Sequence, residues 1–264
     1  MKRRMSSEFI FQLFALLIAV IVVHAVYVGA IRPAAEVQIQ KEMELQASGE
    51  DYVPERTIAV VIRDFEQEAC FILLLWALAI MGYKGRRTMQ EHAILDRRLL
   101  DIPEGTSVLP EDAREYSRSL EALPEQEQDF LLPRTLLAAL QRFATTGSIQ
   151  AVSDTVKESC EIESDRLDSE LSMVRYIAWA IPSIGFIGTV RGIGDALGQA
   201  YKAVEGDISG VTVSLGVAFN STFVALVLSI IIMFCLHQLQ LSQERLVLDS
   251  QRYADKRLMR HLVN

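Results

Sequence analysis

Two threonines lie in long stretches that carry no charged side chain, and hydroxyl groups in such a setting can do chemistry. Thr189 falls within residues 176–190 and Thr222 within residues 211–236, and neither stretch holds Asp, Glu, Lys or Arg. A hydroxyl both donates and accepts hydrogen bonds, so two of them at one depth could line a narrow polar path. A proton path also needs an ionisable relay, so a partner chain would have to supply the carboxylate.

Both threonines share a helix face with small residues, which let two helices approach closely in lipid. On a helix, Thr189 is about 20 Å above Tyr176, where its stretch begins, and Thr222 is about 16 Å below Val211. In a hydrocarbon core of about 30 Å both hydroxyls then lie near the midplane. The small residues on the two faces are Gly185, Gly188 and Gly192 in the first stretch and Ser214, Ala218, Ser221, Ala225 and Ser229 in the second.

Each of these features also has a purely structural interpretation. A threonine in a membrane helix commonly bonds its own backbone one turn earlier. Pro182 either bends its helix without further consequence or provides a flexible point below a channel. Arg191 and Asp195 are four residues apart, just beyond the outer end of the first stretch. They either extend as a pair to the membrane–water interface or form a pore entrance.

Four apolar segments predict an all-α, polytopic membrane protein, because about 20 apolar residues in a helix cross a bilayer. The first segment follows three basic residues, as in a signal peptide. Its apolar run exceeds the roughly 7–15 residues of a signal core, so we expect a retained anchor. The four predicted transmembrane helices are residues 9–31, 69–83, 174–199 and 211–237.

The basic residues near the predicted spans indicate the orientation, because positive charge favours the cytoplasmic side. They lie before the first and third spans and after the second and fourth, which places both termini in the cytoplasm. The polar segments are then residues 1–8, 84–173 and 238–264 on the cytoplasmic side and residues 32–68 and 200–210 on the periplasmic side.

Helical spacing of apolar residues predicts further helices between the spans. The last two spans are expected to extend as long helices into the cytoplasm, the third from Ile149 onward and the fourth through residues 239–262. The other expected elements are a short amphipathic helix over residues 34–45, a helix from Ile58 that runs into the second span, a loop over residues 99–110 and a helix over residues 134–145 that Gly147 ends.

Several function classes have no support in the sequence. The net charge of −8 argues against nucleic-acid binding. The segment 188–194 has glycines, but it follows no predicted strand and lacks the Lys-Ser/Thr ending of a phosphate loop. The chain shows no nucleophile–base pair and no metal-ligand spacing, so we expect neither an enzyme nor a metal site or other cofactor. We expect no disulfide, because Cys70, Cys160 and Cys235 fall at different places in this topology.

The residues from Pro182 to Ile193 resemble the MotA/TolQ/ExbB proton channel family. They read Pro-Ser-Ile-Gly-Phe-Ile-Gly-Thr-Val-Arg-Gly-Ile and are similar to that family's pattern Pro-x-x-Gly-x-x-Gly-Thr-Val-x-Gly-Ile. Ser221-Thr222 followed by Ala225-Leu226 resembles the family's Ala-Thr-x-x-Gly-Leu more weakly. The motif is closest to TolQ and ExbB, but this chain has Arg191 in place of their aromatic residue, Val217 in place of their glutamate, and an extra N-terminal span.

The resemblance implies a homopentamer in the inner membrane of a bacterial cell, around two copies of a single-span partner like TolR, ExbD or MotB. The partner's intramembrane aspartate would carry H⁺ past the ring's threonines, which Thr189 and Thr222 match. Na⁺ is an alternative ion, for which Asn220, Ser221 and Thr222 could offer oxygen ligands. The implied function is a channel or stator subunit of a motor, driven by the proton motive force, that powers a partner process such as protein transport in the cell envelope. The alternative is a membrane scaffold or signalling protein without ion conduction.

Overall fold

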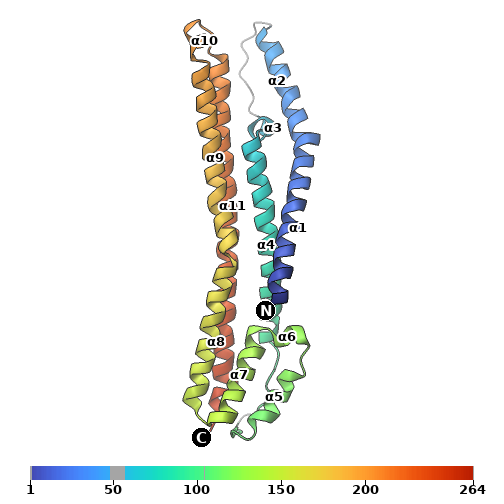
Figure 1. Cartoon of the computed structure of the whole chain (residues 1–264), viewed down its shortest axis with the longest axis vertical. Helices are drawn as coiled ribbons and strands as arrows, with labels where there is room; N and C mark the ends of the chain where they lie inside the picture. Colours follow the sequence, from blue (N-terminus) through green and yellow to red (C-terminus); the bar gives the residue numbers. More distant parts are fainter. Residues whose placement is uncertain (1, 48–56, 104, 264) are drawn as a thin grey trace. The chain divides into compact units, whose positions relative to one another are not determined.

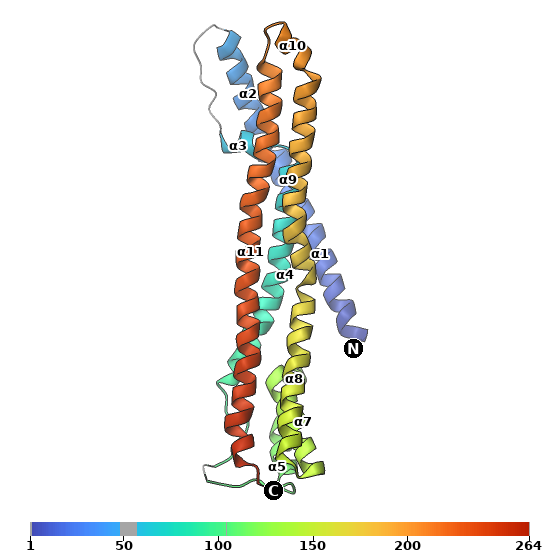
Figure 2. The same cartoon turned by 90° about the vertical axis from the view of Figure 1, so that its left-hand side faces the viewer.

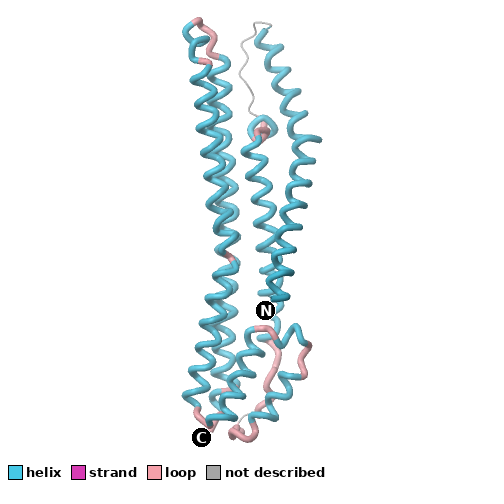
Figure 3. Tube along the Cα trace, in the orientation of Figure 1, coloured by secondary structure: helices cyan, strands magenta, loops and turns pink. Residues whose placement is uncertain are grey.

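The computed structural model describes residues 2–47, 57–103 and 105–263, and this part of the chain is helical without a β-strand (Figure 3). Four helical stretches are long and apolar enough to cross a membrane. The all-α fold with four candidate spans is therefore confirmed. The four stretches are Glu8–Glu42, Phe65–Leu95, Ile149–Gly198 and Ser209–His261.

The chain forms two compact units, and the first, here called the apolar unit, comprises Met1–Met81 and Met173–Leu236. Within it, α9 and α11 lie side by side along their length, as both views show (Figures 1 and 2). The elements that contribute to this unit are α1 (Lys2–Val26), the π-helix η1 (Tyr27–Ile31), α2 (Arg32–Ala47), α3 (Ile58–Val61), the first part of α4 (Phe65–Leu95), α9 (Ser172–Gly198), α10 (Ala200–Val204) and the first part of α11 (Ser209–Arg257).

The N-terminal helix is longer than a bilayer is thick. α1 continues through η1 into α2 without an intervening loop, and a run from Lys2 to Ala47 at 1.5 Å per residue is about 69 Å long. The predicted helix over residues 34–45 therefore exists, but it is the end of a continuous rod rather than a separate element. The outward face of α1 exposes large apolar side chains such as Phe9, Leu13 and Leu17, as expected of a surface that contacts lipid.

The segment before the second span differs from the prediction. A helix starting at Ile58 was expected to run into this span, but α3 ends at Val61 and α4 begins only at Phe65. Asp64 directly precedes α4, and an aspartate at that position favours the start of a new helix. The carbonyl of Val61, freed by the break, accepts a hydrogen bond from Gln67 Nε2 at 3.1 Å, so the interruption leaves this group satisfied.

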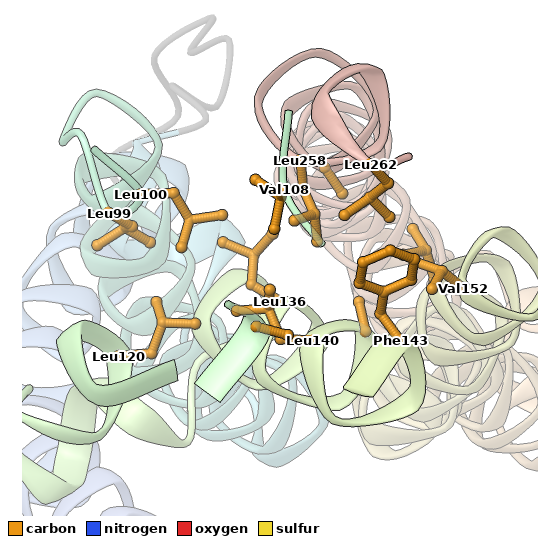
Figure 4. Close-up of a cluster of buried hydrophobic side chains, with 14 of the residues drawn as sticks. Leu99, Leu100, Val108, Leu120, Leu136, Leu140, Phe143, Val152, Leu258 and Leu262 are labelled. Atoms are coloured by element: carbon orange, nitrogen blue, oxygen red, sulfur yellow. The ribbon is translucent and has the colours of Figure 1, made fainter. Parts of the chain in front are cut away.

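The second unit, here called the polar unit, comprises Gly82–Ser172 and His237–Asn264. Leu136, Leu140 and Phe143, the apolar face predicted for residues 134–145, are fully buried in its core (Figure 4). The core also receives Leu258 and Leu262 from the C-terminal segment. The elements here are the end of α4, α5 (Ala113–Glu121), α6 (Glu125–Gln128), α7 (Leu131–Thr146), α8 (Ile149–Glu170), the end of α11 and the 3-10 helix η2 (Met259–His261).

The predicted boundary between α7 and α8 is confirmed and has a clear local cause. Gly147 has a φ of 62°, a left-handed conformation that glycine adopts without steric penalty and that commonly ends helices. Ser148 then accepts a hydrogen bond from the amide of Ala151 as the N-cap of α8. The residues predicted as the loop 99–110 likewise form no helix in their described part.

Candidate functional site

The small residues of α9 pack directly on the small residues of α11, and this contact is here called the seam. A Cβ added to Gly192 would lie 2.8 Å from Ala218 Cβ and 2.8 Å from the carbonyl oxygen of Ser214. A Cβ on Gly185 would collide with that of Ala225. Since real Cβ atoms do not approach so closely, glycine at these positions is what allows the backbones to meet.

The predicted threonine pair meets at the seam. The hydroxyls of Thr189 and Thr222 contact one another, so the equal depth expected from the sequence corresponds to direct contact. Thr189 Oγ1 also lies 3.0 Å from the carbonyl oxygen of Ala218 on the opposite helix and 3.3 Å from that of Gly185. Thr222 Oγ1 lies 3.1 Å from the same Gly185 oxygen. Both hydroxyls are half-buried.

The two hydroxyls have fewer protons than they have acceptors. Each hydroxyl donates one hydrogen bond, whereas the pair faces two backbone carbonyls in addition to each other. If Thr189 donates to Ala218 and Thr222 to Gly185, no proton remains for the bond between them. The pair can therefore rearrange its protons by rotating hydroxyls, without moving a helix. Thr189 also contacts the Gly185 carbonyl one turn earlier, as the purely structural interpretation of this threonine requires. This contact coexists with the contacts to the other helix.

Pro182 lies inside α9, and the seam compensates for its missing amide proton. A proline in a helix leaves the carbonyl four residues earlier without its usual donor, which here is Ala178. Ser229 on α11 donates to that carbonyl at 3.4 Å. The proline signature of α9 and the serine on the small face of α11 are thus parts of one contact.

Three consecutive residues at the start of α4 each bind different helices, and they are here called the polar turn: Glu66, Gln67 and Glu68. Successive helix residues point about 100° apart, so three of them cover most of the circumference of α4. Glu66 accepts two hydrogen bonds from Arg191 on α9, at 2.7 and 2.9 Å. Gln67 donates to Ser221 Oγ on α11 at 3.4 Å.

The third member of the polar turn, Glu68, binds the N-terminal helix. It accepts from His24 Nδ1 on α1 at 2.7 Å and from Arg32 on α2. The guanidinium of Arg32 also lies over the ring of Phe65, 4.5 Å from its centroid, a favourable cation–π position. Glu68 is buried, so its charge is compensated by these partners rather than by water.

Gly188 makes the junction of α4, α9 and α11 possible. A Cβ at this position would lie 2.6 Å from Ser221 Oγ and 3.1 Å from Glu66 Cγ. The same glycine therefore admits both the serine of α11 and the glutamate of α4 against the backbone of α9. This places the polar turn level with the threonine pair, because Gly188 immediately precedes Thr189.

From the sequence, the polar turn is expected in a periplasmic segment, with no relation to the threonines. A signal was present: Glu66-Gln67-Glu68 directly precedes the apolar run that starts at Ala69. The contacts place the threonine pair level with the start of that run, whereas the apolar stretches of α9 and α11 alone suggested the midplane. The carboxylates at this level thus come from α4, and Arg191 of α9 binds one of them.

The remaining predicted residues differ in how closely they join this site. Arg191 binds Glu66 and is 3.9 Å from Asp195, so its main partner is not the one that helical spacing indicated. Asp195 is exposed. Asn220 is half-buried, and its side chain takes part in none of the hydrogen bonds found among the described residues. Ser221 donates to the carbonyl of Val217, so its oxygen and that of Thr222 are directed to different partners.

These features define a polytopic helical membrane protein whose last two spans meet at a hydroxyl-bearing seam. Residues 127–252, just under half of the chain, match the model of the MotA/TolQ/ExbB proton channel family. The matched region includes the whole of the seam, and the family predicted from the Pro182–Ile193 motif is confirmed. Comparison with curated proteins and with solved structures gives no significant match.

Proposed function

We propose that this chain is the channel-forming subunit of an inner-membrane motor complex that couples ion flow to movement of a partner. The observation that carries the proposal is the contact between Thr189 and Thr222 within the region that matches the proton channel family. The pair lies on a seam without ionisable side chains of its own, and its hydroxyl protons can rearrange. Such a pair suits the transient binding of a proton-bearing group.

The proposed mechanism uses a carboxylate from a single-span partner subunit. A partner aspartate that is protonated from the periplasmic side becomes neutral and can pass the apolar surface of the channel chain. Thr189 and Thr222 hydrogen-bond the carboxyl during this passage, and release of the proton toward the cytoplasm restores its charge. Each proton moving down 100 mV supplies about 2.3 kcal/mol, which is enough to bias one step of a tightly coupled cycle.

The proposed assembly is a ring of identical chains, a pentamer by family resemblance, with both termini in the cytoplasm. The exposed apolar side chains of α9 and α11, among them Phe186, Phe219 and Phe223, are available for neighbouring chains, partner helices or lipid. We propose H⁺ as the ion rather than Na⁺. Ser221 and Thr222 are directed to different partners, which does not favour a joint oxygen cage with Asn220.

The test is proton flux through the purified complex in proteoliposomes under an imposed membrane potential. The double variant Thr189→Val and Thr222→Val keeps the shape of both side chains and removes both hydroxyls. We expect it to lose most of the flux while still assembling with its single-span subunit. Thr212→Val is the matched control, because the hydroxyl of Thr212 donates to the carbonyl of Ile208, just before α11, and bonds no other helix among the described residues.

Two outcomes would contradict the proposal. If wild-type complex carries no flux of H⁺ or Na⁺, the chain is not an ion-channel subunit, and a scaffold or signalling role becomes the better explanation. If wild-type flux is present and the double valine variant conducts equally well, the complex conducts but the threonines do not line the path. Replacing H⁺ by Na⁺ gradients in the same vesicles identifies the ion.

A further inference from the structure

We propose that Gln67 on α4 is a further residue of the ion path, where its amide oxygen accepts a hydrogen bond from a passing O–H group. The group would be a protonated carboxyl or a proton-bearing water at the level of the threonine pair. The inference rests on the proposed function and extends it to a helix outside the seam. Family resemblance assigns the path to the helices that carry Thr189 and Thr222, not to α4.

The amide of Gln67 is completely buried and only half satisfied. Its nitrogen donates to the carbonyl of Val61 at 3.1 Å and to Ser221 Oγ at 3.4 Å. Its oxygen Oε1 has no hydrogen-bond partner among the residues that the structure describes, and the residue is 0% exposed. A buried acceptor without a partner is costly, and such groups in folded proteins commonly mark a ligand or a catalytic role.

The assignment of nitrogen and oxygen in this amide follows from its neighbours. The carbonyl of Val61 can only accept a hydrogen bond, so the amide end that faces it must be the NH₂ group. The oxygen is therefore the end left free. Because the nitrogen is held on two sides, the direction of the free oxygen is fixed by the fold and does not depend on a mobile side chain.

Unpaired polar atoms concentrate around this corner of the apolar unit. Among the described residues, five buried side-chain oxygens lack a partner, and four of them belong to η1, the residue before α3, the link between α3 and α4, and α4. Thr135 in the polar unit is the fifth. The four are Tyr27 Oη, Thr57 Oγ1, Asp64 Oδ2 and Gln67 Oε1. Such a concentration indicates a place that receives a polar group, because random defects would be spread over both units.

The serine that binds Gln67 connects it to the threonine pair. Ser221 Oγ accepts from Gln67 Nε2 and donates to the carbonyl of Val217, and Thr222 follows it directly in α11. Gln67 is thus one residue from the hydroxyl pair along α11 and approaches it from α4. A group bonded to the threonines can then exchange to Gln67 Oε1 within the same layer of the bundle.

A second glutamine provides an internal control. Gln199, which lies between α9 and α10, donates to Ser214 Oγ on α11 at 3.0 Å. Ser214 is about two helical turns from Ser221. This pair repeats the amide–serine contact of Gln67 and Ser221. Gln199 is only half-buried and has no buried oxygen without a partner. If amide–serine contacts served helix packing alone, removing either amide would have a similar effect on ion flux.

The experiment compares Gln67→Leu, Gln67→Glu and Gln199→Leu in the reconstituted complex, with proton flux and thermal stability measured for each. We expect Gln67→Leu to lower flux about tenfold, the effect of losing one hydrogen bond to a proton-bearing group, and Gln199→Leu to stay within about twofold of wild type. Gln67→Glu keeps an oxygen acceptor but adds a group that ionises. Its flux should depend on pH differently from wild type at pH values where its thermal stability is unchanged, whereas a packing role would change flux and stability together.

Each outcome decides the question. If the wild-type complex conducts and Gln67→Leu conducts equally well, the role of Gln67 is overturned. Equal losses of flux in Gln67→Leu and Gln199→Leu would overturn it too. Both outcomes leave the proposed function intact. If Gln67→Leu fails to assemble, Gln67→Glu becomes the decisive variant, and a pH profile parallel to wild type overturns the inference. Absence of flux from wild type itself would instead refute the proposed function, and the role of Gln67 with it.

Discussion

The seam of the apolar unit and the core of the polar unit are both helix contacts, but they are built from opposite kinds of residue. At the seam, Gly185, Gly188 and Gly192 meet Ala, Ser and Thr, and hydroxyls bond backbone carbonyls of the facing helix. In the polar unit, large side chains such as Leu140 and Phe143 fill the space between helices and are fully buried.

The difference reflects the solvent that each contact excludes. In water, burying apolar side chains drives helices together, and larger side chains contribute more. In lipid the surrounding chains are as apolar as leucine, so association relies on close packing and on hydrogen bonds between helices. A seam of small residues is also what leaves room for hydroxyls at a helix contact, so the requirement for packing in lipid creates the conditions for a polar path.

The largest expected effect comes from the polar unit. Leu140→Ala should lower the free energy of unfolding by about 2–5 kcal/mol, because it removes a fully buried side chain and leaves a cavity. Leu248→Ala is the matched control on α11, where the leucine is 51% exposed, and it should cost well under about 1 kcal/mol. Denaturant titration in mixed micelles measures both, and similar losses would show that this core is not a conventional hydrophobic core.

In the seam, the damaging change is the addition of a methyl group rather than its removal. Gly185→Ala should destabilise the chain by about 1–3 kcal/mol through overpacking, because the new Cβ meets Ala225 and the backbone of Ser221. Gly194→Ala on the same helix should be neutral or slightly stabilising, since no other atom lies within 4 Å of its added Cβ. Equal effects of these two variants on thermal stability would refute the close contact described for the seam.

An intermediate effect is expected for the ion pair that joins α4 to the seam. A double-mutant cycle with Glu66→Gln and Arg191→Gln should give a coupling of about 1 kcal/mol, limited by the partial exposure of Arg191. The same cycle between Arg191 and Asp195 should give a coupling near zero, because Asp195 is exposed and 3.9 Å away. A larger coupling for Asp195 would mean that Arg191 belongs to a pore entrance rather than to the polar turn.

The smallest expected effect concerns the hydrogen bond from Ser229 to the carbonyl that Pro182 leaves without a donor. Ser229→Ala should cost about 0.6 kcal/mol, a typical value for a hydrogen bond between membrane helices. In a Pro182→Ala background the Ala178 carbonyl regains a donor from its own helix, and the cost of Ser229→Ala should disappear. Ser183→Ala, whose hydroxyl bonds only Trp179 of its own helix, should show no such dependence on Pro182. Additive effects of Pro182→Ala and Ser229→Ala would refute the proposed compensation.

Much of the fold was predictable because the signals are local. Stretches without charge predicted the four spans, helical spacing predicted α7 and the long α11, and Gly147 predicted the end of α7. The interruption between α3 and α4 was not predicted, because it depends on Gln67 binding the Val61 carbonyl across the break. Apolar periodicity continues through this segment and gives no sign of that bond.

The sequence by itself determined that the chain is an all-helical membrane protein, that Thr189 and Thr222 lie on small-residue faces, and which family its second half matches. Residue type and spacing within one helix are sufficient for these conclusions. Only the tertiary structure decided that the two hydroxyls touch and that Glu66, Gln67 and Glu68 each bind different helices at their level. Such contacts depend on the relative shift of helices far apart in sequence, and close packing of side chains sets that shift.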